Sequence, residues 1–234
     1  MERQIDRISS GVPGFDALLE GGIPKGSVII LAGHAGVGKT TFCAQFLGRG
    51  CNLGQKSLYV TFTEIKTKLF RNMKQFGFLL ADLEEKGLLR TEFIQLNGQN
   101  NVGITIDQIV KVMEEFQPKR LVIDSATSLA LAVPGGRPDT TSMLQNLFAK
   151  LGSFEECTTV LVAEMSSGTD QFGSGIEEFI SDGVGLVRIR NRGKARVMSL
   201  EIRKMRGTAH SSKSVLFEVT DRGIEIDPEI ELTS

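Results

Sequence analysis

Residues 27–40 read SVIILAGHAGVGKT, and this stretch decides the fold. Ser27 to Ala32 form a short apolar run with β-branched side chains, as expected of a central strand buried on both faces. Gly33 to Thr40 fit the pattern G-x-x-x-x-G-K-[ST], and a segment with helical spacing begins at Thr40. A strand, a glycine-rich turn and a helix in this order are typical of a phosphate-binding loop.

The chemistry of such a loop assigns a task to each residue type. Glycines let successive backbone N–H groups turn inward around phosphate oxygens, and the following helix presents its positive end. The ammonium of Lys39 is expected to reach the outer phosphates, where it acts in catalysis, and the hydroxyl of Thr40 to hold Mg²⁺. The expected phosphate contacts are Gly33, His34, Ala35, Gly36, Val37, Gly38, Lys39, Thr40 and Thr41.

The same kind of apolar run recurs along the chain and alternates with segments of helical spacing. Strand-like runs lie at 57–63, 91–96, 119–124 and 158–163, and helical spacing at 40–48, 67–76, 105–116 and 140–151. This alternation predicts an α/β fold with right-handed βαβ units and a mainly parallel central sheet flanked by helices. Beyond Gly175, strands at 184–190, 196–204 and 215–220 are joined by short polar turns, which predicts a C-terminal antiparallel β-meander.

Length and composition favour a single soluble domain over the 234 residues, with 27 basic and 28 acidic side chains and a net charge of −1. No stretch approaches a membrane span, so we expect a cytoplasmic protein without membrane contact. Cys43, Cys51 and Cys157 form no CxxC pair, which disfavours a disulfide framework or a zinc site. The expected parts are an N-terminal segment at 1–26, a phosphate-loop core at 27–182, an antiparallel extension at 183–226 and a loose acidic tail at 227–234.

Acidic residues at strand ends supply the remaining chemistry. Asp124 ends a buried strand, where a carboxylate orients the shell of Mg²⁺ beside a phosphate loop. Hydrolysis also needs a group that positions the attacking water, and Glu64, after the strand at 57–63, is the strongest candidate. The alternative for Glu64 is a solvated acid in the first turn of the next helix. Glu164 is a second candidate on weaker grounds.

Several segments together resemble one branch of the RecA/RadA ATPases, the KaiC family. They are residues 10–26, the phosphate loop, LVIDSATS at 121–128, residues 175–182 and the LEIRKMRGTAH stretch at 200–210. The resemblance runs from about Ile8 to Ile226 and corresponds to one of the two tandem domains of the clock protein in that family. The chain is therefore similar to the single-domain members, which are known chiefly from archaea.

The resemblance implies a RecA-like core that assembles as a homo-oligomeric ring, commonly a hexamer, with ATP or ADP and Mg²⁺ between subunits. One subunit would give the phosphate loop and the next would give cations that stabilise charge on the γ-phosphate. Gln75 is implied near the adenine. The residues implied to reach the neighbour's nucleotide are Lys204, Met205, Arg206, Thr208, His210, Thr220 and Asp221.

Two departures from the family pattern bear on activity. The family usually has Phe-Glu-Glu after the second strand, and this chain has Phe62-Thr63-Glu64. Either Glu64 substitutes for the missing catalytic acid, or the protein binds ATP and turns it over slowly. The phosphorylated domain of the clock protein has a Ser-Thr acceptor pair where this chain has Glu178-Phe179, so autophosphorylation at that place is not available.

The leading hypothesis is thus an Mg²⁺-dependent ATPase whose nucleotide state sets ring conformation and contact with an unknown protein partner. A single-stranded DNA-binding module, in which ATP stabilises assembly, is the alternative. The loops expected nearest the ring axis, 132–139 and 166–175, carry Arg137 as their only cation, which is unfavourable for DNA. A basic cluster surrounds a hairpin turn and is interpreted as solvated more readily than as a partner surface; it consists of Arg188, Arg190, Arg192, Lys194 and Arg196.

Overall fold

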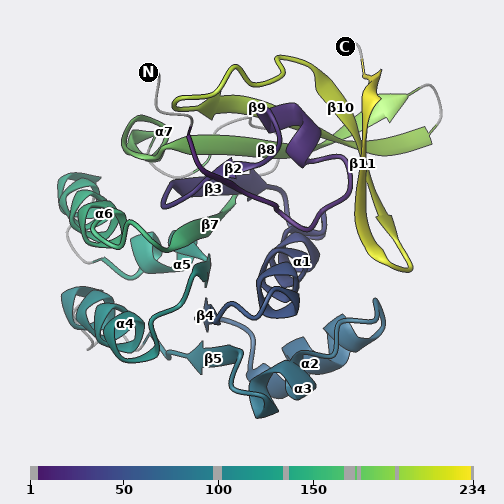
Figure 1. The fold of residues 1–234 in the computed structure, drawn as a ribbon. Coiled ribbons are helices and arrows are strands. Elements are labelled where there is room, and N and C mark those ends of the chain that lie inside the picture. The colour runs from purple at the N-terminus through teal and green to yellow at the C-terminus, as the bar shows by residue number, and fades with distance from the viewer. Residues whose placement is uncertain are drawn as a thin grey trace.

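The phosphate-loop strand lies at the centre of one large sheet in the computed structural model (Figure 1). The structure describes residues 5–96, 102–133, 137–165, 172, 175–192 and 195–232. Within them the order of the nine-stranded sheet is β11-β10-β9-β8-β3-β7-β6-β4-β5, with β3 at Val28–Gly33. This arrangement confirms the expected α/β class.

Four further strands make the parallel half of the sheet. They are β4 (Ser57–Thr61), β5 (Leu89–Phe93), β6 (Arg120–Asp124) and β7 (Thr158–Glu164). All run in the direction of β3, so their carboxyl ends share one edge of the sheet. Only β5 departs clearly from the sequence prediction. It begins two residues before the start of the predicted 91–96 run and ends three residues before the end of that run.

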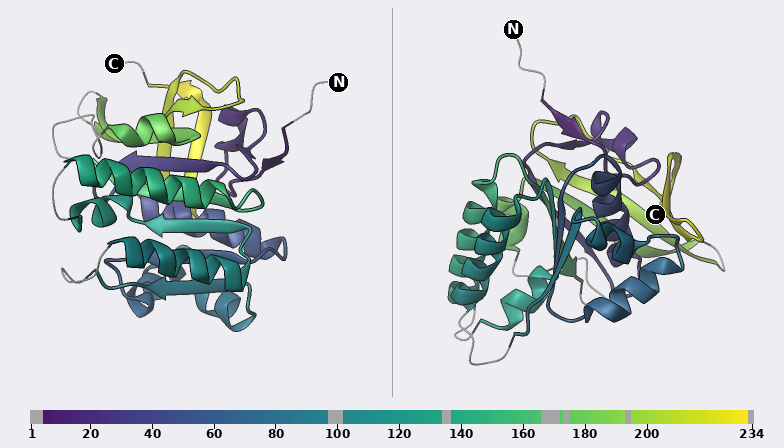
Figure 2. Two further views of the ribbon diagram at one scale, coloured as in Figure 1. Left: turned by 90° about the vertical axis from the view of Figure 1, so that its left-hand side faces the viewer. Right: turned by 60° about the horizontal axis from the view of Figure 1, so that its bottom comes forward.

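Helices cover both faces of this parallel half (Figures 1 and 2). One face carries α1 (Lys39–Asn52), α2 (Lys66–Lys74) and α3 (Leu80–Glu85), and the other carries α4 (Val102–Phe116), α5 (Ala126–Leu131) and α6 (Arg137–Gly152). Successive residues of β3 point to opposite faces, so Ile29 and Leu31 pack with α1 while Ile30 packs with α4 and α6. Of the helices in the described ranges, none has the length and apolar character needed to cross a bilayer.

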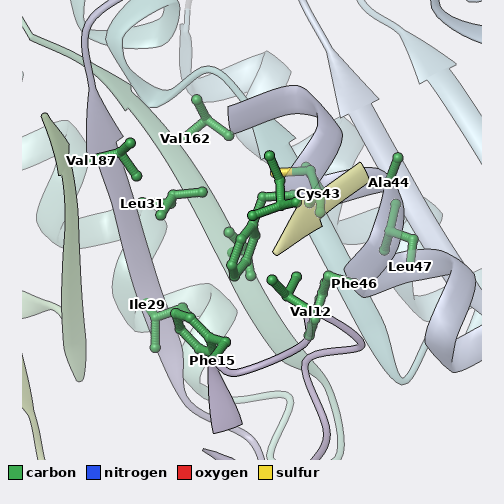
Figure 3. Close-up of a cluster of buried hydrophobic side chains, with 14 of the residues drawn as sticks. Val12, Phe15, Ile29, Leu31, Cys43, Ala44, Phe46, Leu47, Val162 and Val187 are labelled. Atoms are coloured by element: carbon green, nitrogen blue, oxygen red, sulfur yellow. The ribbon is translucent and has the colours of Figure 1, made fainter. Parts of the chain in front are cut away.

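The core beneath α1 also binds the N-terminal segment to the sheet (Figure 3). Val12 and Phe15 are buried among side chains of α1 and β3, and the rings of Phe15 and Phe42 meet edge to face with centroids 5.0 Å apart. The segment contains the short strands β1 (Arg7–Ile8) and β2 (Ile23–Pro24), which pair with each other, and the 3-10 helix η1 (Asp16–Leu19). The N-terminal segment is therefore packed into the core.

The C-terminal part of the chain is the predicted meander, and it extends further than predicted. After α7 (Ile176–Ile180), strand β8 (Gly183–Arg192) runs parallel to β3, and β9 (Ala195–Met205), β10 (Ser214–Thr220) and β11 (Gly223–Glu231) follow in antiparallel order. The expected loose tail at 227–234 is a strand as far as Glu231, which lies opposite Val215. Acidic composition suggested a free end, but backbone pairing with β10 holds it.

A buried arginine joins the N-terminal segment to α1 at the amino edge of the sheet. Arg120, at the start of β6, is fully buried and donates hydrogen bonds to the carbonyl oxygens of Ser9 (2.8 Å) and Phe46 (3.0 Å) and to Gln55 Oε1 (3.1 Å). Its guanidinium also lies 4.8 Å from the centroid of the Phe46 ring. Burial lowers the pKa of Arg120 to about 10. The carbonyl oxygens and the π-face of Phe46 compensate the buried positive charge.

Two glycines of α1 test this packing. A Cβ on Gly50 would lie 2.4 Å from Cδ of Arg120, whereas a Cβ on Gly48 would meet nothing within 4 Å. We expect Gly50→Ala to destabilise the protein by about 1–3 kcal/mol through overpacking, and Gly48→Ala to stabilise it by up to about 1 kcal/mol through helix propensity. Denaturant unfolding of both variants is the measurement, and equal stabilisation by the two would contradict a rigid Arg120.

Candidate functional site

The loop between β3 and α1 has the backbone that phosphate binding requires. Gly36 and Gly38 have φ values of 79° and 91°, which favour glycine, and Gly38 is the residue before α1. A Cβ on Gly33 would lie 2.7 Å from the carbonyl oxygen of Val187. Ala35 and Gly36 are exposed, while Val37 anchors the loop in the core. The sequence therefore folds into an open turn of backbone N–H groups at a helix N-terminus, which suits phosphate oxygens.

Lys39 is held at the base of this loop. Its side chain is 5% exposed, and Nζ donates to the carbonyl oxygens of Gly33 (2.8 Å) and His34 (2.7 Å). Nζ also lies 3.0 Å from Oε2 of Glu164, the last residue of β7, whose side chain is 42% exposed. A buried ammonium needs compensating oxygens, and these three partners provide them. They also occupy the N–H donors of Lys39 that a bound phosphate would otherwise use.

Asp124 and Thr40 face each other beside the loop, as expected for a pair that holds a metal. Thr40 Oγ1 donates to Asp124 Oδ2 at 3.2 Å, and the hydroxyl of Tyr59 donates to the same oxygen at 2.8 Å. Burial raises the pKa of Asp124 above its ordinary value, although both hydrogen bonds oppose this. A hydroxyl and one buried carboxylate at the edge of the phosphate site are the sparse, all-oxygen ligands that Mg²⁺ accepts in proteins, so the residues fit this ion.

The two candidate acids for water positioning differ in their surroundings. The Glu64 carboxylate accepts a hydrogen bond from Nδ2 of Asn72 on α2 at 2.9 Å, and the backbone N–H of Glu64 donates to Thr61 Oγ1 at 3.2 Å. Glu164 contacts Lys39 directly and its backbone N–H donates to Thr127 Oγ1 at 2.8 Å. Thr63, at the position of the missing acid, is exposed. Both acids lie at the carboxyl edge, and Glu164 is the one in contact with the phosphate-loop lysine.

The basic segment at the end of β9 lies at the opposite edge. Lys204 pairs with Val184, and Gly183 pairs with both Met205 and Ile29, so this segment is beside the start of β3. The phosphate loop follows the end of β3, about 15 Å away at roughly 3.3 Å per residue. Lys204 and Arg206 are therefore placed where they cannot serve the phosphate loop of their own chain.

Both cations have partners within the chain at this edge. Lys204 Nζ donates to the carbonyl oxygens of Glu178 (2.7 Å) and Ser181 (2.6 Å), and burial lowers its pKa. Arg206 donates to the carbonyl oxygen of Phe179 at 2.9 Å and lies 3.2 Å from Asp182. Lys204 thus stabilises the end of α7, while the more exposed Arg206 has the freer guanidinium.

The remaining residues that resemblance assigned to the neighbour's nucleotide fall into two places. Met205 is buried, Thr208 Oγ1 accepts a hydrogen bond from Arg7 at 2.9 Å, and His210 Nδ1 lies 3.1 Å from the carbonyl oxygen of Ser211. Thr220 and Asp221 instead form the turn between β10 and β11; Thr220 Oγ1 donates to the carbonyl oxygen of Gly223, and Asp221 is 92% exposed. The structure does not bring these two sets together.

The β10–β11 turn lies over the chain's own phosphate loop. A Cβ on Gly38 would lie 3.0 Å from Val219 Cγ2 and 2.9 Å from Ile224 Cδ1. Gln45 of α1 fixes the hairpin, because its side chain both donates to the carbonyl oxygen of Ile224 (3.0 Å) and accepts from the N–H of Ile224 (2.6 Å). The turn therefore lies beside the phosphate loop of its own chain.

Gln75, the candidate for the adenine, is exposed directly after α2.

The predicted basic cluster is less uniform than its sequence. Arg188 is buried and forms an ion pair with Glu201 across the β8–β9 ladder, whereas Arg196 is exposed. The side chain of Arg192 and all of Lys194 lie outside the described residues, as do 134–136 and most of 166–174 in the two loops expected near a ring axis. Arg188 is thus a structural residue of the meander.

Three supporting residues escaped sequence reasoning. Tyr59 orients Asp124, Thr127 positions the end of β7, and Asn72 holds Glu64. A signal existed for Tyr59, the single tyrosine of the chain, since its hydroxyl within a buried apolar strand requires a partner. Asn72 and Thr127 lie on helices whose relation to the site depends on tertiary packing.

Comparison with known proteins agrees with this geometry. The sequence profile of the family described as "ATPase: KaiC" matches residues 8–231. A UPF0273 protein of Aeropyrum pernix is 32% identical over 96% of this chain and 95% of its own length, and a circadian clock oscillator protein KaiC of Acaryochloris marina is 31% identical over 96% of this chain and 44% of its own length. A crystal structure of a KaiC-like protein from Pyrococcus horikoshii OT3 superposes with a TM-score of 0.87, at 35% identity over 96% of this chain and 100% of that one.

The contact between Glu164 and Lys39 gives a prediction about affinity. Glu164→Gln removes a charge that competes with phosphate for the ammonium, so we expect the dissociation constant for ATP with Mg²⁺ to fall roughly two- to tenfold. Glu156→Gln is the matched control, because Glu156 pairs with Lys25 and Lys119 away from the loop. Equilibrium titration with a fluorescent ATP analogue measures the change, and weaker binding by Glu164→Gln would show that Glu164 supports the nucleotide instead.

Proposed function

Given that this chain belongs to the KaiC family of ATPases, we propose that it binds and hydrolyses ATP with Mg²⁺ between neighbouring copies of a homo-oligomeric ring. A hexamer is the expected size. The nucleotide state of such a ring would set its conformation and so its contact with a protein partner, which is a regulatory role. The family supports nucleotide binding, and the ring, the metal and the regulation are our proposal.

The observation that carries this proposal is the division of the site between two edges. Lys39, Thr40 and Asp124 gather at the carboxyl edge of the sheet, and Lys204 and Arg206 lie at the amino edge. A nucleotide at the first edge can meet the second only if that edge belongs to another copy. Repeated head-to-tail contacts of this kind generate a closed ring or a filament.

Each residue of the candidate site has a task in this proposal. The backbone N–H groups from Ala35 to Thr40 bind phosphate oxygens, and Lys39 moves from its carbonyl partners to the outer phosphates. Thr40 and Asp124 would hold Mg²⁺, which neutralises charge on the phosphates when bound. Arg206 of the adjoining copy stabilises the charge that develops on the γ-phosphate. Glu64, held by Asn72, orients the attacking water.

Thr63 gives a reason to expect slow turnover. A threonine hydroxyl at this position can accept a hydrogen bond from water but is a far weaker base than a carboxylate. Hydrolysis then depends on Glu64, whose carboxylate already accepts a hydrogen bond from Asn72. The proposed enzyme therefore suits a switch, in which the lifetime of bound ATP matters more than throughput.

Steady-state hydrolysis measures this assignment. We expect Lys39→Ala and removal of Mg²⁺ by EDTA each to lower the rate at least about 100-fold, because charge on the phosphates loses its stabilisation. Glu64→Ala should lower the rate and leave ATP binding intact, while Glu85→Ala, an acid at the end of α3, serves as the control. Hydrolysis that is negligible for the wild type, with and without single-stranded DNA, would contradict the enzyme; stimulation by DNA would favour the alternative.

Mixed assemblies test the contribution of the neighbour. Arg206→Ala alone should lose roughly 10³-fold in rate, as for an arginine supplied in trans. When Arg206→Ala and Lys39→Ala chains are mixed in equal amounts, roughly one quarter of the sites regain both groups if the contact is head-to-tail. Absence of recovery, after native mass spectrometry shows that mixed assemblies formed, would refute supply of Arg206 from a second copy.

A further inference from the structure

One oxygen of the Asp124 carboxylate is held by two hydroxyl groups. The phenol of Tyr59 on β4 donates to Asp124 Oδ2 at 2.8 Å, and Thr40 Oγ1 donates to the same oxygen at 3.2 Å. Among the described residues, none donates a hydrogen bond to Oδ1 of this carboxylate. The two oxygens of Asp124 therefore differ, because Oδ2 is committed within the chain and Oδ1 is left for another ligand.

The register of the sheet fixes the contact with Tyr59. Tyr59 lies opposite Val122 of β6, and Asp124 follows two residues later on the same face of the sheet, which α1 covers. Such diagonal neighbours lie beyond the reach of a short side chain but within the reach of an aromatic one. The Tyr59 ring is buried, and close packing restricts it to this position. A phenylalanine in its place would keep the ring and lose only the donor.

The difference between the two oxygens bears on the choice of cation. Mg²⁺ demands a near-ideal octahedron and keeps several waters, whereas Ca²⁺ takes more oxygens in a flexible geometry and often both oxygens of one carboxylate. Because Oδ2 is held by two donors, Asp124 can offer only Oδ1 to a cation or to a water of its shell. A carboxylate limited to one oxygen suits Mg²⁺ better than Ca²⁺.

We propose that Tyr59 selects the cation of the nucleotide site, by holding Asp124 Oδ2 so that the carboxylate presents one oxygen to Mg²⁺ and cannot chelate Ca²⁺ through both. This inference rests on the proposed function, in which Thr40 and Asp124 hold Mg²⁺, and adds the residue that excludes the larger ion. Thr40 cannot perform this task, because its own hydroxyl is a proposed ligand of the cation. Tyr59 is a positioning residue, since it acts through Asp124.

Binding of a fluorescent, slowly hydrolysed ATP analogue in Mg²⁺ or in Ca²⁺ measures this selection without any reaction. The readout is the ratio of the dissociation constant in Ca²⁺ to that in Mg²⁺, which should exceed one for the wild type. We expect Tyr59→Phe to lower this ratio about three- to tenfold, the size expected of one buried hydrogen bond. Circular dichroism and denaturant unfolding show that the variant is folded.

Two further variants separate selection from a merely structural effect. Ser57→Ala is the matched control, because Ser57 starts β4 on the same face as Tyr59 and its buried hydroxyl donates to the carbonyl oxygen of Leu47 at 3.1 Å. It should lower stability and leave the ratio unchanged, and a shift equal to that of Tyr59→Phe would overturn the selection. In an Asp124→Asn background, Tyr59→Phe should leave the ratio unchanged, and a full shift there would overturn action through Asp124.

The wild type distinguishes this inference from the proposed function. Equal binding of the analogue in EDTA and in Mg²⁺ would contradict the metal of the proposed function and this inference with it. A wild type that requires Mg²⁺ but binds as tightly in Ca²⁺, or a ratio that Tyr59→Phe leaves unchanged, would overturn only the selection by Tyr59.

Discussion

The register of the parallel strands is the constraint on which the site depends. Gly33 lies opposite Glu164 on one side and Val187 on the other, and Thr61 lies opposite Asp124. A slip of one residue would turn every side chain of a strand to the other face and separate these groups. Because the strands are buried on both faces, packing with α1 on one side and α4 and α6 on the other holds the register.

This register also explains how the charges of the site are compensated within the chain. It brings Glu164 to within 3.0 Å of Lys39, and the carbonyl oxygens of the loop are further partners of the buried ammonium. Asp124 is compensated less fully, by two hydroxyl donors, and burial raises its pKa. A cation placed between Thr40 and Asp124 would relieve that cost, and this is a physical reason for including Mg²⁺ in the proposed function.

The meander determines how the two edges of the sheet differ. By adding β8 parallel to β3 and then reversing direction, it returns β9 to the amino edge with Lys204 and Arg206, and carries the β10–β11 turn back over Gly38. One extension thus supplies a basic surface at one edge and a cover for the phosphate loop at the other. Under the proposed function, in which the site is divided between copies, activity would depend on assembly.

Local sequence by itself determined the phosphate loop, the alternation of the main strands and helices, and the class of the fold, because glycine positions, apolar runs and helical spacing are properties of neighbouring residues. The strand at Gly223–Glu231, the hydrogen bond from Tyr59 to Asp124 and the ion pair of Arg188 with Glu201 came only from the tertiary structure. The same holds for Lys204, whose cationic sequence context gave no sign that three carbonyl oxygens around the end of α7 accept its hydrogen bonds. Each of these contacts joins residues distant in the chain, and which polar groups must satisfy one another is decided when burial removes water.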